Sequence, residues 1–203
     1  MKAELAKSFW DAVRRMRAAR RTEDPRIAPT PASPLATQQA FELPLQEALQ
    51  RLDAIRDRCR TLVTRRATLS AGAAVVPLPG LDIGTDVAIL IKLLPKINEE
   101  FGLTPEQIDK LDTDTKSVVM MFITGLGASL VGRLVTRELV IKLLMKLGVR
   151  VTTKGIVKFV PLLGQALSAS ISFGAMKMLG NQHIDDCYAV ARRTLLETSR
   201  RVS

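Results

Sequence analysis

Residues 75–86 read Val-Val-Pro-Leu-Pro-Gly-Leu-Asp-Ile-Gly-Thr-Asp, and this stretch separates two helical patterns in the chain. Pro77 and Pro79 fix their own φ angles and push the preceding residues toward extended backbone. Gly80 relieves the backbone after the second proline. The stretch therefore predicts an apolar elbow from which a new helix starts.

Asp82 and Asp86 lie one helical turn apart directly after this elbow. Asp82 stands where its carboxylate can accept hydrogen bonds from the open amides of the new helix. The spacing would also suit paired acid–base chemistry, but no third polar partner lies nearby in the sequence. We expect Asp82 to cap the helix and Asp86 to pair with a cation. Such an elbow is either a junction within a core or a break at membrane depth.

Helical patterns flank the elbow on both sides, and the composition carries little strand signal. A helix over about residues 44–70 has an apolar stripe at helical spacing, with arginines mostly off it. The stripe consists of Leu45, Leu49, Leu52, Ile55, Cys59, Leu62 and Val63. A helix over about residues 82–101 ends at Gly102, and Thr104 caps a short acidic helix. The prediction is an all-α fold, a helical bundle of hydrophobic hairpins.

Three further apolar segments and a mixed helix follow, at residues 117–132, 134–147, 159–176 and 184–200. The first segment is free of charge for 16 residues and the third for 18, near the lower limit of roughly 17–25 residues for a membrane span. Pro161 and Gly164 repeat the proline–glycine order of the elbow before an apolar helix. They predict a second elbow.

The charge of the connecting segments alternates. Residues 92–116 carry a net charge of −2 and residues 133–158 carry +6. If residues 67–91, 117–132 and 159–176 all crossed a bilayer, the positive segments would lie in the cytoplasm, as the positive-inside rule requires. A basic ridge on a soluble bundle would give the same count. Membrane insertion and a soluble bundle therefore both stay open.

Residues 1–21 predict a basic amphipathic helix with a net charge of +5. The proline-rich residues 22–40 predict a linker without fixed structure, and residues 41–203 form the helical domain. The candidates for contact with a membrane surface are Phe9, Trp10, Arg14, Arg15 and Arg17. An ordinary helix docked on the body and a nucleic-acid-binding arm are the alternatives.

The chain of 203 residues is long enough for one core, and its net charge of +10 favours acidic partners. Anionic lipids are the preferred partner, and nucleic acid is disfavoured because the basic residues lack aromatic stacking partners. Cys59 and Cys187 have no metal or redox spacing and predict buried free thiols in a reducing compartment. No cleavable signal peptide is visible, so we expect the cytoplasm as the starting compartment.

Several patterns resemble catalytic or binding motifs without meeting their requirements. Residues 127–134 keep the spacing of a phosphate loop, but arginine and leucine replace its Lys and Ser/Thr. His183 is the single histidine, so a histidine-rich metal site is excluded. Asp109, Asp112 and Asp114 lack the glycine and glutamate of a calcium loop and are expected to cap helices or face solvent. We predict no catalytic residues, no cofactor, no metal and no enzymatic activity.

The elbow, with Pro77, Pro79, Gly80, Asp82 and Asp86, an aliphatic helix and Phe101-Gly102, resembles the start of the YcjF-type bacterial domain of unknown function 697. It is also similar to the helical C-terminal region of the immunity-related GTPases. The likeness covers about residues 65–182. It implies a helical, membrane-linked module that works beside a GTPase. The chain lacks a G domain, so GTP hydrolysis is not carried over.

Together these features predict a non-enzymatic, membrane-associated helical module that acts beside a GTPase or another partner protein. The expected location is the bacterial cytoplasm and inner membrane, with cytoplasmic-side or integral attachment. A soluble helical adaptor that binds a partner through an apolar groove is one alternative. A pore-forming or bilayer-perturbing effector is another, and homo-oligomerisation stays open.

Overall fold

The computed structural model describes residues 4–21, 34–74, 81–128, 130–146 and 161–202, and these residues are helical or lie in short turns. The helices are α1 (Glu4–Arg21), α2 (Pro34–Ala74), α3 (Leu81–Phe101), α4 (Pro105–Asp109), α5 (Thr113–Gly125), α6 (Arg137–Lys146) and α7 (Pro161–Val202). No strand occurs within these ranges. The predicted all-α bundle is confirmed.

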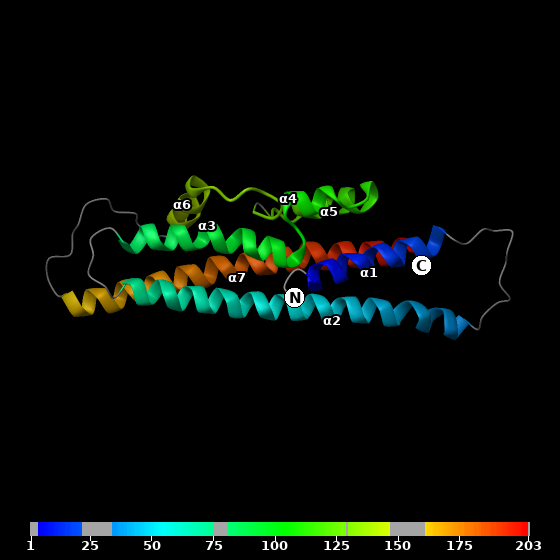
Figure 1. Ribbon diagram of the computed structural model, residues 1–203, viewed down its shortest axis with the longest axis horizontal. Coiled ribbons are helices and arrows are strands. Elements are labelled where there is room, and N and C mark those ends of the chain that lie inside the picture. The colour runs from blue at the N-terminus through cyan, green and yellow to red at the C-terminus, as the bar shows by residue number, and fades with distance from the viewer. Residues whose placement is uncertain (1–3, 22–33, 75–80, 129, 147–160, 203) are drawn as a thin grey trace.

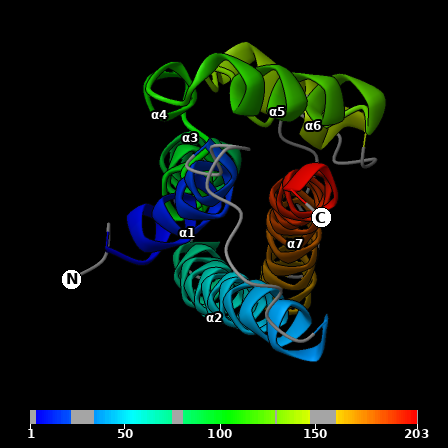
Figure 2. The same cartoon turned by 90° about the vertical axis from the view of Figure 1, so that its right-hand side faces the viewer.

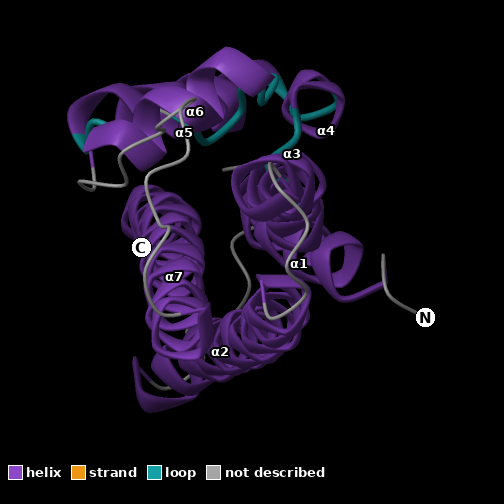
Figure 3. Ribbon diagram, turned by 90° about the vertical axis from the view of Figure 1, so that its left-hand side faces the viewer, coloured by secondary structure: helices purple, strands orange, loops and turns teal. Residues whose placement is uncertain are grey.

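The long helices α2, α3 and α7 pack lengthwise and form the body of the bundle, with the most extensive contact between α2 and α7 (Figure 1). The shorter α1 packs on α2 and α7 near the C-terminal end of α3. Views from the two ends show α5 and α6 in a second layer, where α5 contacts α7 and α6 contacts α3 (Figures 2 and 3). The molecule is therefore an elongated bundle covered along one side.

The core runs through the centre of the body, and residues of α4, α5 and α6 extend it into the outer layer. Phe9 of α1, Leu52 of α2, Leu94 of α3 and Leu195 of α7 are all fully buried. The stripe predicted on α2 is buried or half-buried throughout its length. Burying a large apolar side chain contributes roughly 1.5–3 kcal/mol, so this stripe stabilises the bundle as the sequence indicated.

Two predicted helix boundaries are wrong. α2 starts at Pro34 and not near Pro44, so residues 34–40 are helical and do not belong to a linker; Pro44 lies inside the helix. The segment before Pro44 is rich in alanine, leucine and glutamine, which have high helix propensity. α7 runs without interruption from Pro161 to Val202 and joins what the sequence separated into an apolar run and a mixed helix. Residues 22–33 lie outside the described part of the chain.

The connection from α3 to α5 follows the prediction closely. Gly102 adopts a left-handed φ of 70° after the last residue of α3. A Cβ there would lie 2.3 Å from the Trp10 Nε1 atom, so the position requires glycine for both backbone and space. Thr104 then caps α4 in a capping box with Gln107. Asp112 caps α5 by accepting a hydrogen bond from the Thr115 amide at 3.1 Å.

Candidate functional site

The residues of the elbow motif are only partly placed. α3 begins at Leu81, so the predicted helix restart after the elbow is confirmed, and Asp82 lies in the first turn. Pro161 is the first residue of α7, where proline is well tolerated. The described side chains do not include those of Asp82, Asp86 and Gly164, and Pro77, Pro79 and Gly80 lie outside the described residues. The capping and ion-pairing roles stay predictions.

The apolar residues of α1 face the bundle and not an outer surface. Phe9 is fully buried, and Trp10 is 5% exposed and donates a hydrogen bond from Nε1 to the Phe101 carbonyl oxygen at 2.9 Å. This arrangement corrects the expectation that Phe9 and Trp10 contact a membrane, because the body already covers both rings. The structure thus agrees with the alternative in which residues 1–21 form an ordinary helix that packs on the body. Arg14 and Arg15 are exposed, Arg14 pairs with Asp11, and the described side chains do not include that of Arg17.

A buried polar cluster links α3, α7 and the loop that follows α5. The Cys187 thiol donates to Asn98 Oδ1 at 3.4 Å, and Asn98 Nδ2 donates to the Leu130 carbonyl oxygen at 3.2 Å. His183 Nε2 lies 3.8 Å from the Cys187 sulfur. The sequence analysis missed this cluster, since its only local signal is a histidine and a cysteine one turn apart.

The electrostatics of this cluster favour uncharged side chains. Burial lowers the pKa of His183 to about 4, partly offset by the Leu94 carbonyl. Burial raises the pKa of the Cys187 thiol, so the reactive thiolate is disfavoured. Within the described ranges, no group of three or more histidine, cysteine or acidic side chains is arranged to hold a metal ion. The cluster therefore positions helices and does not form a nucleophile or a metal site.

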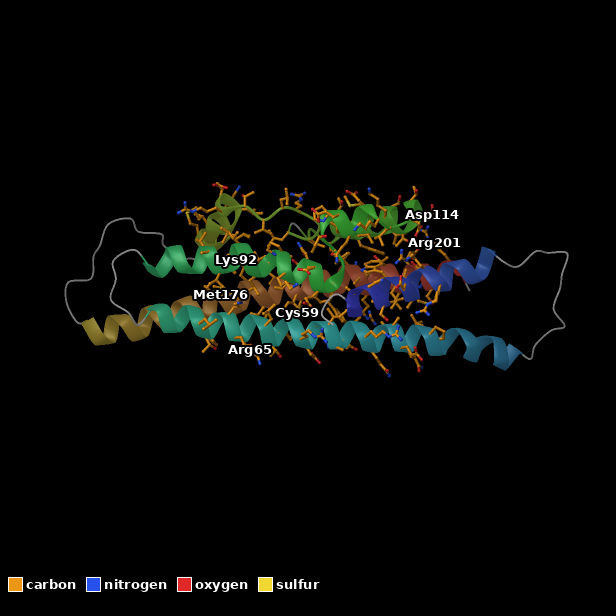
Figure 4. All side chains as sticks on the ribbon, in the orientation of Figure 1. Cys59, Arg65, Lys92, Asp114, Met176 and Arg201 are labelled. Atoms are coloured by element: carbon orange, nitrogen blue, oxygen red, sulfur yellow. The ribbon has the colours of Figure 1, made fainter. Side chains whose placement is uncertain are left out.

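A surface groove between α2 and α7 is the better candidate for a functional site. It is open to solvent, has a volume of about 360 Å³, and is lined by Arg60, Thr61, Thr64, Arg65, Lys177 and Asn181. Figure 4 shows Arg65 on the side of α2 that faces away from the bundle centre. The volume lies near the lower end of the roughly 300–1,000 Å³ typical of small-molecule sites. We call this feature the α2–α7 groove.

The cations of the α2–α7 groove are incompletely neutralised. Arg60 donates to Asp185 at 3.2 Å, with both side chains about half exposed. Among the described side chains, no carboxylate pairs with Arg65 or Lys177. The Lys177 ammonium instead lies 5.7 Å from the centre of the Phe173 ring. Two cations that no carboxylate among the described side chains neutralises therefore line the same groove, one from each helix.

Exposed apolar side chains lie on the same two helices next to this groove. Leu69 follows Arg65 by one turn of α2 and is 63% exposed. Met178 adjoins Lys177, precedes Asn181 by about one turn of α7 and is 57% exposed. A positively charged surface with protruding apolar side chains suits the boundary between headgroups and acyl chains of an anionic bilayer.

A second set of exposed apolar side chains lies on the outer layer. It consists of Met120 and Met121 on α5, Leu134 in the loop after α5, and Met145 on α6. Flexible methionine side chains adapt to different partner surfaces. The outer layer is therefore the part of the described surface that best suits contact with another protein.

Comparisons with known proteins assign the chain to no family, and the all-helical class rests on the structure alone. No family model matches it, and neither the curated proteins nor the solved structures contain a match. In the ranges that the structure describes, no helix combines the length and the apolar character that crossing a bilayer requires. The resemblance of residues 65–182 to the domain of unknown function therefore stays a prediction.

Proposed function

We propose that this protein is a non-enzymatic helical module that binds the surface of anionic membranes through the α2–α7 groove and its surroundings. The observation that carries the proposal is a pair of cations, Arg65 and Lys177, that no carboxylate among the described side chains neutralises, beside the exposed Leu69 and Met178. Each basic residue near an anionic bilayer contributes about 1 kcal/mol of attraction. The net charge of +10 adds a favourable long-range field.

The proposal places the contact on the body of the bundle and not on α1. Docking buries Phe9 and Trp10, so using them at a membrane would require α1 to leave the bundle. The α2–α7 groove needs no rearrangement. The expected site of action is the cytoplasmic face of the bacterial inner membrane, beside a partner GTPase. Both the location and the partner rest on the family resemblance.

Flotation with lipid vesicles tests membrane binding directly. The full chain should float with vesicles that contain phosphatidylglycerol, should not float with pure phosphatidylcholine, and should dissociate in high salt because exposed charges are screened. Absence of flotation with anionic vesicles would contradict the proposal. Dye leakage from the same vesicles would favour the bilayer-perturbing effector instead.

Two exposed methionines give a matched test of which face binds. Met178→Ser alters the surroundings of the α2–α7 groove, and Met145→Ser alters the outer layer; the two side chains are 57% and 52% exposed. The proposal expects weaker flotation for Met178→Ser and wild-type flotation for Met145→Ser. The reverse result would assign membrane contact to the outer layer.

An adaptor that binds a partner protein is the second candidate, favoured by the methionine-rich outer layer. The partner that the resemblance indicates is a GTPase, and a GTPase gene adjacent to this one would identify the protein to purify and test. Binding that is lost in Met120→Glu and kept in Met178→Glu would place that partner on the outer layer. Absence of binding in the wild-type protein would remove the support for this candidate.

A further inference from the structure

We propose that the α2–α7 groove is a binding site for a phosphate monoester. The inference rests on the proposed membrane function and specifies the chemical group that the groove would recognise. A phosphate monoester carries a charge of about −1.5 to −2 at neutral pH and three terminal oxygens. These properties match the charge and the hydrogen-bond donors that the lining side chains offer.

Charge is the first match. Asp185 engages Arg60 at the edge of the groove, which leaves Arg65 and Lys177 as two cations without a carboxylate among the described side chains. A dianion would neutralise both together. A phosphate diester carries a single charge and would leave one cation unneutralised.

Donor geometry is the second match. Arg65 and Lys177 extend from opposite helices, and Asn181 also lines the groove. Asn181 Oδ1 is buried without a hydrogen-bond partner, and no contact within the described part of the chain uses the amide nitrogen. Three donor groups are thus available for three phosphate oxygens, and charge-assisted hydrogen bonds of this kind are the strong ones.

The close approach of α2 and α7 fixes the backbone positions from which these side chains extend. A Cβ on Gly180 would lie 2.8 Å from both γ-methyl groups of Val63, so the helices are in tight contact beside the groove. The hydroxyls of Thr61 and Thr64 donate to carbonyl oxygens of their own helix, those of Asp57 and Arg60. The groove is therefore an open site on two tightly packed helices, with its cations at the rim. The remainder of the ligand would extend outward, toward a bilayer or into solvent.

The test compares two arginines that are neighbours in the sequence. Arg65 lines the groove, whereas Arg66 is exposed and does not line it. Arg65→Gln and Arg66→Gln remove the same charge, and Lys177→Gln serves as a second groove variant. Binding is measured on vesicles with phosphatidic acid, a monoester, and with phosphatidylglycerol, a diester, at equal surface charge. Inorganic phosphate is titrated separately while the side-chain amide resonances of Asn181 are followed by NMR.

The proposal expects tighter binding to the monoester vesicles and about tenfold weaker binding for Arg65→Gln and Lys177→Gln, corresponding to one charge-assisted hydrogen bond each. Arg66→Gln should weaken binding to the monoester and diester vesicles alike, by about fivefold or less, because it removes only the general attraction of about 1 kcal/mol for one charge. Circular dichroism checks that all variants fold.

The two proposals fail in different ways. Equal losses in Arg65→Gln and Arg66→Gln without monoester preference would overturn the phosphate site and leave membrane binding intact. A second outcome is that the protein does not bind vesicles, while phosphate shifts the Asn181 resonances only when Arg65 is present. This outcome would overturn the membrane function and retain the groove as a site for a free phosphate compound. Absence of both responses would overturn both.

Discussion

Individual buried polar side chains define how α3 and α7 meet. Asn98, His183 and Cys187 are in contact although Asn98 and Cys187 are 89 residues apart in the chain. A sequence scan sees only a lone histidine and a free thiol at these positions. Their shared role depends on two helices that the chain brings together after a long separation.

His183 should make the stability of the protein depend on pH. Its pKa is about 4 when folded, against 6.5 when exposed, so the unfolded chain binds the extra proton between these values. The contribution of neutral His183 to the free energy of unfolding is fully present above about pH 6.5. It is lost as the pH drops toward 4, which lowers the free energy of unfolding by roughly 3 kcal/mol. Urea unfolding of the wild type and His183→Gln at pH 7 and pH 4.5 measures the difference.

The glutamine variant is the control because the chain has no other histidine. Its stability should fall less between the two pH values than that of the wild type. Equal losses in the two proteins would show that carboxylates, and not His183, dominate the acid sensitivity.

At the scale of the helix, apolar periodicity predicted which face of α2 is buried, because one face of a helix must be covered for the helix to persist. The same information did not predict where helices end. α7 continues through Gly174 and Gly180 for a total of 42 residues. Packing against α2 compensates for the low helix propensity of these glycines.

The two glycines of α7 should respond to alanine in opposite directions. Gly180→Ala places a methyl group 2.8 Å from the branched Val63 side chain, whereas nothing lies within 4 Å of a Cβ at Gly174. We expect Gly174→Ala to stabilise the protein by about 0.5–1 kcal/mol, and Gly180→Ala to destabilise it by about 1–2 kcal/mol because overpacking outweighs the gain in propensity. Urea unfolding measures both.

A companion variant tests the cause. Val63→Ala combined with Gly180→Ala should lose less stability than the sum of the two single changes, since the contact is then relieved. Stabilisation by Gly180→Ala alone would contradict the close approach of α2 and α7 at this point.

At the scale of the whole molecule, α1 is the element that the sequence placed least well. Its amphipathic pattern suits a membrane surface and a protein core equally, because both accept an apolar face. In the structure, α1 contacts α2, α3 and α7, so its apolar face lies in the protein core. The same contacts shift the proposed membrane surface to the α2–α7 groove.

The docking of α1 can be followed through the single tryptophan of the chain. Phe9 is fully buried, so Phe9→Ala should cost about 3–5 kcal/mol of the packing that holds α1. In this variant the Trp10 fluorescence should shift to the red at a lower urea concentration than the loss of helical circular dichroism. Arg15→Ala, at an exposed position of α1, should leave the two transitions as in the wild type. Coincident transitions in Phe9→Ala would mean that α1 unfolds together with the body.

The sequence by itself determined the all-α class, the buried face of α2, the helix end at Gly102 and the N-cap at Thr104, and the absence of familiar catalytic motifs. These are local properties, set by helical periodicity, backbone preference and side-chain chemistry within a few residues. Only the tertiary structure decided that α1 is docked, that Asn98 meets Cys187, and that Arg65 and Lys177 share one groove. Those features join segments far apart in the chain, and their geometry arises from how whole helices pack.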